Sequence, residues 1–239
     1  GMKRPLLSFP ALLGLFLSAA TAANPVTTEN VTASLVAERP AAAPDSSVAL
    51  ALVLEMRPGW HTYWRNPGDS GEPTSIRWQL PPGVSAGPIR WPHPALIRVG
   101  PLANYGYSGK AVHLVDLSVP PGWPVGRPLE VTARAAWLVC EEECIPESAL
   151  LRLTLPVEAG QGPPDPAVAA LIGSARRRLP SAFPGQVSLT DGGGGSLRLT
   201  AERVPLPANI LSARFFPWSW GLIEHAADQQ MQLTADRLS

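Results

Sequence analysis

The chain has 239 residues, and its 19 basic and 19 acidic residues cancel to a net charge of zero. This balance gives no electrostatic reason to expect binding to nucleic acid or to an anionic membrane surface. Glycine and proline number 21 and 28. They are frequent enough to separate many short strands, which indicates a globular, β-rich protein.

The first 22 residues have the pattern of a secretory signal peptide. Gly1, as a cloning remnant, precedes a basic start at Lys3 and Arg4. An apolar run, Leu6–Ala19, then leads to the small-residue cleavage pattern Ala20–Ala22. We therefore exclude residues 1–22 from the fold and expect the mature chain in an oxidising compartment, where a cysteine pair can form a disulfide.

Residues 23–159 show the pattern of an immunoglobulin-like β-sandwich. Apolar and polar residues alternate in about seven short stretches with turn residues between them. A lipocalin-like barrel is the alternative, and the proline-rich connections disfavour it. A Gly- and Tyr-rich loop over Leu102–Lys110 and a second loop over Pro120–Pro128 are expected between the later strands. The predicted strands are Val31–Glu38, Val48–Met56, an aromatic strand end from Trp60 running into a turn at Gly71, Ile76–Leu80, Ile89–Trp91, Val112–Val119, Leu129–Val139 and Leu150–Val157.

Residues 160–184 are predicted to be a linker with a short helix, Pro166–Leu179, capped by Asp165. Arg176, Arg177 and Arg178 fall in its last turn, either as a binding patch or as a solvated helix end. Residues 185–239 are predicted to form a second, smaller β module, which is either small in itself or part of a longer one. Its predicted strands are Val187–Thr190, Leu197–Ala201, Ile210–Phe216 and Met231–Ala235.

The two cysteines, Cys140 and Cys144, fall at the tip of the hairpin formed by the last two sandwich strands. Facing residues of antiparallel strands have Cα atoms roughly 4.5–5.5 Å apart, which suits a disulfide. As a structural staple, a loop this short would contribute roughly 2 kcal/mol, and a chain of this length can bury a core without that help. Exposed disulfides are the labile ones, so a redox-active pair and a staple both stay open.

The loop between the cysteines is acidic, with Glu141, Glu142 and Glu143, and Glu147 follows. Like charge beside a thiol disfavours the thiolate and is expected to raise the pKa of the pair. A partner's low-pKa thiolate should then start the exchange, or the partner should supply a base. The alternative is that these carboxylates are simply solvated.

Metal chemistry has little support in the sequence. The four histidines, at 61, 93, 113 and 225, do not stand at metal-binding spacing from one another or from the cysteines. Two thiolates could hold Cu(I), which prefers soft ligands, and this is a third possibility for the pair. No Gly-rich phosphate loop is present, and we expect no cofactor.

Several stretches carry a family resemblance: Gly59–Gly71 (GWHTYWRNPGDSG), Asn104–Lys110 (NYGYSGK), Trp137–Glu147 (WLVCEEECIPE) and Phe215–Ile223. The first three resemble the amino-terminal periplasmic domain of the DsbD family of thiol:disulfide interchange proteins, most of all its copper-sensitivity-suppressor branch, ScsB. The fourth resembles the second β module of that branch. The resemblance covers nearly the whole mature chain.

The resemblance implies roles for particular residues. Cys140 and Cys144 would be the redox pair, and Tyr107 or else Tyr105 would be an aromatic cap that covers it. Tyr63 and Trp64 would be aromatic neighbours of the site. The founding DsbD domain has a longer gap between its cysteines than the three residues here.

The resemblance also implies partners and a location. A thioredoxin-like domain would donate electrons, and periplasmic thiol proteins, including copper-tolerance proteins, would receive them. A membrane electron-transfer domain would belong to the same or another chain. The rival interpretations are a non-catalytic immunoglobulin-like binding module with a structural disulfide, and a Cu(I)-binding protein of copper tolerance.

Overall fold

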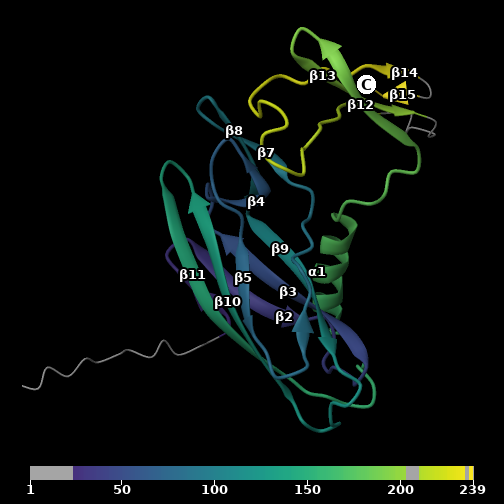
Figure 1. Cartoon of the computed structure of the whole chain (residues 1–239). Helices are drawn as coiled ribbons and strands as arrows, with labels where there is room; N and C mark the ends of the chain where they lie inside the picture. Colours follow the sequence, from purple (N-terminus) through teal and green to yellow (C-terminus); the bar gives the residue numbers. More distant parts are fainter. Residues whose placement is uncertain (1–23, 203–209, 235–236, 239) are drawn as a thin grey trace, which may run out of the picture.

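The structure is a computed structural model that describes residues 24–202, 210–234 and 237–238. The predicted signal peptide, residues 1–22, lies outside the described residues. Two antiparallel sheets pack face to face as an immunoglobulin-like β-sandwich, and a helix and a small third sheet follow (Figure 1). Within the described ranges, no helix is long and apolar enough to cross a membrane.

Both sheets of the sandwich are built from antiparallel pairs. The first sheet has the order β1 (Val26–Thr27), β2 (Val31–Ala37), β3 (Ser46–Met56), β9 (Lys110–Val119) and β6 (Ser85–Ala86). The second has the order β11 (Cys144–Leu155), β10 (Leu129–Cys140), β4 (His61–Gly68), β8 (Leu102–Ser108) and β7 (Ala95–Val99), with β5 (Ser75–Gln79) also paired to β10.

The main core lies between the two sheets, and a smaller core lies on the outer face of the first. Alternation along β3 sends Leu50 and Leu52 into the main core and Ala51 and Val53 to the other face. The helix α1 (Pro166–Arg177) covers that outer face with Ile172 and Ala175. Strand β3 is therefore buried on both sides, which explains its nearly continuous apolar sequence.

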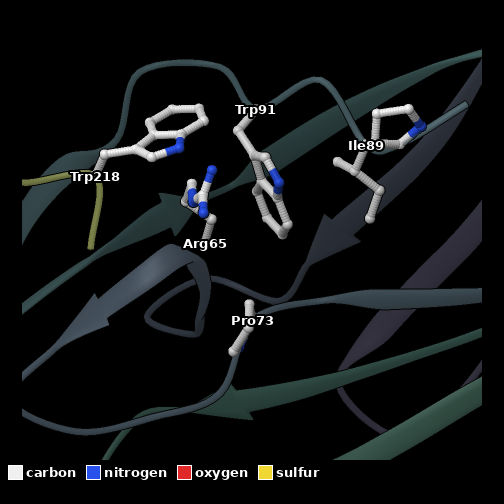
Figure 2. A pocket seen from close by; sticks show the side chains of 6 residues that line it. Arg65, Pro73, Ile89, Trp91 and Trp218 are labelled. Atoms are coloured by element: carbon white, nitrogen blue, oxygen red, sulfur yellow. The ribbon is translucent and has the colours of Figure 1, made fainter. Parts of the chain in front are cut away.

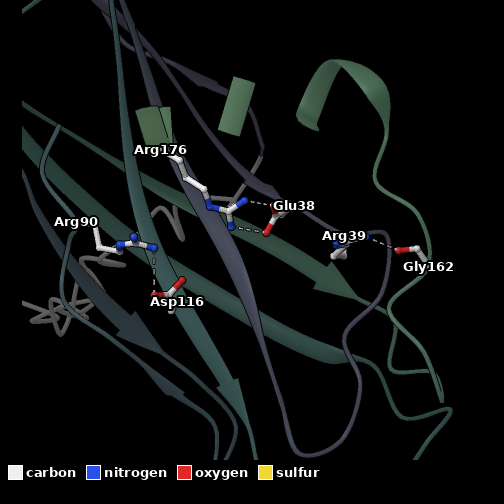
Figure 3. Close-up of polar contacts among 6 residues, drawn as sticks. All are labelled: Glu38, Arg39, Arg90, Asp116, Gly162 and Arg176. Carbon is white, nitrogen blue, oxygen red and sulfur yellow. Dashed lines mark hydrogen bonds and ion pairs between the residues drawn. The ribbon is translucent and has the colours of Figure 1, made fainter. Parts of the chain in front are cut away.

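Side chains near both ends of the helix α1 make contacts that hold it in place. Asp165 accepts hydrogen bonds from the backbone N–H groups of Ala167 and Val168, which fits an N-cap before a first-turn proline. Near its end, Arg176 forms an ion pair with Glu38 of the connection after β2 (Figure 3). This pair holds the pKa of Glu38 below its usual range. The contact of Arg176 therefore fixes the helix to the sandwich.

The second β module consists of one small sheet and an irregular segment. Its strands have the order β12 (Gln186–Gly193), β13 (Ser196–Glu202), β15 (Arg237–Leu238) and β14 (Leu233–Thr234). The segment before β14 returns to the sandwich, where Phe216 packs edge-on against Trp64 and Tyr105. In Figure 1 this segment, in yellow, comes down beside β7 and β8.

The predicted loop over Leu102–Lys110 is wrong, because most of it is the strand β8. The prediction took Gly106 as a sign of a loop. A Cβ at Gly106 would lie 2.0 Å from the carbonyl oxygen of Thr62 on β4. Glycine is therefore present so that two strands can approach closely, and not because the chain turns.

Two predicted strands are also wrong and a third is shorter. Around Ile89–Trp91 only an isolated bridge forms, between Arg90 and Leu114. Residues 210–216 are irregular, because the apolar side chain of Phe216 packs on the sandwich without its backbone joining a sheet. The strand predicted over Met231–Ala235 shrinks to β14, and its last residue lies outside the described part of the chain.

Candidate functional site

The two cysteines form a disulfide at the tip of the β10–β11 hairpin. Cys140 ends β10 and Cys144 begins β11, where they pair directly in the antiparallel register with Cα atoms 4.2 Å apart. The two cysteines differ in solvent exposure: Cys140 is only 3% exposed, whereas Cys144 is exposed. An incoming group from solvent therefore meets Cys144 first.

Strand β4 places a hydroxyl against the disulfide. Cys140 also pairs with His61, which brings β4 to the hairpin tip. Two residues further along, Tyr63 donates a hydrogen bond to Sγ of Cys140 at 3.0 Å, and its oxygen lies 3.7 Å from Sγ of Cys144. The Nε2 atom of His61 lies 3.3 Å from the same hydroxyl. One phenol thus contacts both sulfurs and one imidazole.

Burial keeps both of these groups uncharged. Tyr63 is 1% exposed, and burial raises its pKa, with a smaller opposing effect from Ser70. Burial also lowers the pKa of His61. At neutral pH the disulfide therefore faces a neutral phenol donor backed by a neutral imidazole.

The turn after β4 leaves room for the tyrosine ring. Gly71 has a φ of +101°, and a Cβ there would lie 2.2–2.5 Å from three ring atoms of Tyr63. Gly59, before β4, has a φ of +88°, and a Cβ there would lie 2.8 Å from a carboxylate oxygen of Glu141. Both glycines of the motif at 59–71 therefore shape the surroundings of the disulfide.

The acidic residues divide into two groups. Glu141, Glu142 and Glu143 are all exposed in the loop between the cysteines. Glu147 instead accepts hydrogen bonds from the backbone and side-chain nitrogens of Asn30, both at 3.0 Å, and from the indole N–H of Trp137 at 3.3 Å. It therefore ties the start of β11 to the segment before β2 and to β10.

The other predicted aromatic residues have partners elsewhere. The hydroxyl of Tyr107 donates to the carbonyl of Pro92 at 2.8 Å, and its ring lies edge-on to His113. Tyr105 lies within hydrogen-bonding distance, 3.0 Å, of Nδ1 of His225. Among the described residues no hydrogen bond joins either tyrosine to the cysteines. The cap role of Tyr107 or Tyr105 stays a prediction.

Trp64, the remaining predicted neighbour, packs on the opposite side of β4 from Tyr63. Its ring lies 6.5 Å from Tyr105 and 5.6 Å from Trp218 of the C-terminal segment. Asn66 on the same strand donates to the carbonyl of Pro217 at 2.8 Å. Strand β4 therefore contacts the disulfide through Tyr63 and the C-terminal segment through Trp64 and Asn66.

Sequence reasoning assigned no role to His61, Gly71 or His225. The two-residue spacing of His61 and Tyr63 on a predicted strand was a signal that both share a face. Nothing local in the sequence indicated that His225 would reach Tyr105, because that contact joins residues 120 positions apart.

The described residues contain no group of three or more histidine, cysteine, aspartate or glutamate side chains that could hold a metal ion. An arrangement with one exposed sulfur, one buried sulfur and a hydroxyl donor on the buried one is suited to thiol–disulfide exchange.

Comparison with known proteins agrees with this chemistry. The family described as "Thiol:disulfide interchange protein DsbD, N-terminal" matches residues 32–156. The crystal structure of the N-terminal periplasmic domain of ScsB from Proteus mirabilis is similar in fold, with a TM-score of 0.54 and 21% identity. That match covers 74% of this chain and 65% of the other, so this chain spans less than two thirds of its length.

A yeast GGA1 GAE domain matches 54% of this chain and 94% of its own, at 10% identity and a TM-score of 0.31, too weakly to support an argument. No curated protein matches the chain significantly. The family match covers more than half of the sequence and includes both cysteines and the strand that carries Tyr63. The chain therefore belongs to the family of the N-terminal domain of the thiol:disulfide interchange protein DsbD.

Proposed function

We propose that this chain is a periplasmic thiol:disulfide interchange module. It accepts electrons at the Cys140–Cys144 pair from a thioredoxin-like partner and passes them to client disulfides. The observation that carries the proposal is the asymmetry of the disulfide. Cys144 is exposed, while Cys140 is buried beneath the hydroxyl of Tyr63.

The first step follows from that asymmetry. The partner's thiolate attacks Sγ of Cys144, a new disulfide forms between the two proteins, and the bond to Cys140 breaks. Cys140 leaves as a thiolate carrying the electron pair of that bond. The hydroxyl of Tyr63 already points at this sulfur at 3.0 Å. A hydrogen bond to a charged acceptor is stronger than one to a neutral acceptor, so this contact favours the leaving group.

The second step releases the reduced module. The partner's second thiolate attacks the partner's sulfur atom in the mixed disulfide, and the sulfur of Cys144 leaves. The partner is then oxidised to a disulfide, and the module holds two thiols after taking up two protons. Reduction of a client reverses these steps: Cys144 attacks the client disulfide, and Cys140 then attacks Sγ of Cys144 to free the client.

The acidic loop affects which side starts the reaction. Glu141, Glu142 and Glu143 are exposed in the loop between the two cysteines. Their charge disfavours a thiolate in the reduced module at neutral pH. A partner whose own thiol has a low pKa therefore starts the exchange more readily than this module does. A cationic partner surface would offset the same carboxylates on docking.

The cellular setting is proposed from the family and the sequence. The likeness to a solved periplasmic domain and the leader predicted over residues 1–22 support a periplasmic location. A membrane electron-transfer domain, in the same or another chain, would resupply electrons through the thioredoxin-like partner. Clients would be periplasmic thiol proteins, copper-tolerance proteins among them. Tyr107 is proposed as a cap that opens when a partner docks.

Two single-cysteine variants test the order of attack. Cys140→Ser leaves only the exposed thiol, and Cys144→Ser leaves only the buried one. With the reagent 5,5′-dithiobis(2-nitrobenzoic acid), we expect the Cys140→Ser variant to react at least about tenfold faster, because access limits thiol exchange. Equal rates in the folded proteins would contradict the proposed order. Near-ultraviolet circular dichroism confirms that both variants are folded.

Electron transfer itself has a direct test. A reduced thioredoxin-like protein is mixed with the oxidised chain, and the thiols of each are alkylated and counted by mass. We expect two thiols to appear on this chain and two to disappear from the partner. The double variant Cys140→Ser/Cys144→Ser is the control and should leave the partner reduced.

A further inference from the structure

A cavity of about 430 Å³ opens beside β4. Its walls come from four separate stretches of the chain: β4, the turn before β5, the connection after β6 and the C-terminal segment (Figure 2). Arg65 on β4 lies between the two indole rings in this view. The lining residues are Arg65, Pro73, Pro88, Ile89, Trp91 and Trp218.

Among the described residues that line the cavity, Arg65 is the only charged one, and its N–H groups are available for hydrogen bonds. The guanidinium carbon lies 3.9 Å from the ring centroid of Trp218, so one flat face of the group is stacked. Within the described part of the chain, no carboxylate lies at ion-pair distance from it, whereas Arg90 and Arg98 each have an aspartate partner. Stacking leaves the N–H groups at the edge free for an anion, and their fork suits a carboxylate.

The rest of the cavity is apolar and open to solvent. Trp218 is 50% exposed, and Trp91 is partly exposed on the other side of Arg65. Two prolines and Ile89 complete the wall. Aromatic-lined grooves accept the proline residues of extended peptides, and burial of any apolar side chain against such a surface is favourable. The cavity therefore offers an apolar surface and a carboxylate-binding group side by side.

The cavity is built in part on the strand that also carries Tyr63. Arg65 follows Tyr63 by two residues on β4, a distance of roughly 7 Å along a strand. Pro73 follows Gly71, which packs against the ring of Tyr63, by two residues. The cavity and the tyrosine that contacts the disulfide therefore share strand β4 and the turn that follows it.

We infer that this cavity binds an extended segment of a redox partner in which a proline or leucine side chain lies beside a carboxylate. The carboxylate pairs with Arg65, and the apolar side chain lies against Trp91 and Trp218. That the partner is a redox protein rests on the proposed function, but binding of such a segment to the cavity does not.

Matched peptides test the site on the unaltered, oxidised protein. The probe is acetyl-Pro-Leu-Glu-amide, and acetyl-Pro-Leu-Gln-amide differs from it only in the charge. Binding is followed by the indole N–H signals in two-dimensional NMR, with those of Trp91 and Trp218 assigned through Trp→Phe variants. We expect the glutamate peptide to shift both signals and the glutamine peptide to bind roughly tenfold more weakly, because one charged hydrogen-bonded pair is lost.

A pair of arginine variants completes the test. Arg65→Gln should lose the difference between the two peptides, and Arg77→Gln, an exposed arginine of β5 outside the cavity, should keep it. Absence of indole shifts, or equal binding of both peptides to the unaltered protein, would overturn the inference and show that Arg65 only fastens Trp218 to the sandwich. The titration involves no thiol. If the chain exchanges disulfides but does not bind the peptides, only the proposal of a binding cavity is wrong. If it binds the peptides but does not exchange disulfides, only the proposed function is wrong.

Discussion

The hydroxyl of Tyr63 is the polar group that contacts both sulfurs of the disulfide. Its own surroundings hold it there. His61 lies edge-on to the ring with centroids 5.3 Å apart, and Gly71 lies against it with no room for a Cβ. A side chain fixed in this way needs no rearrangement when the Cys140 thiolate forms, so its hydrogen bond acts directly on the rate of exchange.

Replacing this hydroxyl should slow reduction of the disulfide. In Tyr63→Phe the ring stays but the donor to Cys140 is lost. A hydrogen bond to a charged sulfur is worth roughly 1.5–3 kcal/mol, so we expect reduction by dithiothreitol to be about tenfold slower or more. Quenching with an alkylating reagent and counting thiols by mass gives the rate.

Tyr105→Phe is the matched control, because that hydroxyl contacts His225 and not the disulfide. Its reduction rate should equal that of the unaltered protein. If Tyr63→Phe were also reduced at the unaltered rate, the hydroxyl would have no role in stabilising the leaving thiolate.

At this scale the sequence indicated part of the site. Cys140 and Cys144 were identifiable because they are the only cysteines and flank a hairpin tip. Tyr63 was identified through its motif. The contact between its hydroxyl and Cys140 joins residues 77 positions apart. Alternation along a strand predicts which residues share a face, but not which residue of another strand they meet.

Among the elements, the turn from β4 to β5 has a strict steric requirement. Gly71 combines a φ of +101° with a ring carbon of Tyr63 only 2.2 Å from where a Cβ would stand. A side chain at this position is therefore strained in its backbone and also displaces the tyrosine.

Gly71→Ala should affect both stability and the redox site. We expect a loss of roughly 2–4 kcal/mol in the free energy of unfolding, together with slower reduction of the disulfide, because Tyr63 must move. Urea unfolding and the thiol-counting assay measure the two effects.

The variant Gly109→Ala is the control that separates the effect of backbone strain from the effect of displacing the Tyr63 ring. Gly109 also has a positive φ, +71°, but nothing lies within 4 Å of a Cβ there. It should cost only about 1 kcal/mol of backbone strain and leave the reduction rate unchanged. Equal effects of the two substitutions would show that the ring contact at Gly71 is unimportant.

The elements predicted from alternation were right where one face is buried and the other is not. Strand β10 matches the predicted strand Leu129–Val139 closely, whereas β11 begins at Cys144, six residues before the predicted start at Leu150. Strand β8 was missed because its tyrosines and glycine resemble a loop, although Tyr105 and Tyr107 are both buried in the sandwich. The close packing of Gly106 on β4 explains why that stretch is a strand. Such packing is not encoded by any local sequence pattern.

In the whole molecule, the C-terminal segment folds back onto the sandwich across Trp64 and Tyr105. The sequence predicted a second β module but not this return. The boundaries at residues 159 and 184 stay predictions. Because the segment contributes Trp218 to the cavity beside β4, the two modules share a surface.

The pH dependence of stability is a property of the whole fold to which one fully buried histidine contributes. His113 on β9 is completely buried between Trp91 and Tyr107, and burial lowers its pKa to about 4. The unfolded chain therefore binds the proton more readily than the folded chain. The stability that neutral His113 maintains is complete above about pH 6.5 and is lost as the pH falls toward 4.

Urea unfolding should reveal this loss. Between about pH 7 and pH 4.5, we expect the unaltered protein to lose roughly 2 kcal/mol more of its free energy of unfolding than the variant His113→Leu. His61 has its pKa lowered by burial too, but it is present in both proteins and cancels in the difference.

His93→Gln, at an exposed histidine, serves as the control and should retain the full acid sensitivity. Identical pH profiles for His113→Leu and the unaltered protein would contradict a buried, neutral His113.

The reduction potential of the Cys140–Cys144 pair tests the central claim most directly. The mature protein is equilibrated with glutathione or dithiothreitol buffers, the thiols are trapped by alkylation, and the fraction reduced is counted by mass. A module that exchanges disulfides with thioredoxin-like partners should have a potential of about −180 to −270 mV. A value well below about −300 mV would mark a structural disulfide, and the chain would then be a binding module and not a carrier of electrons.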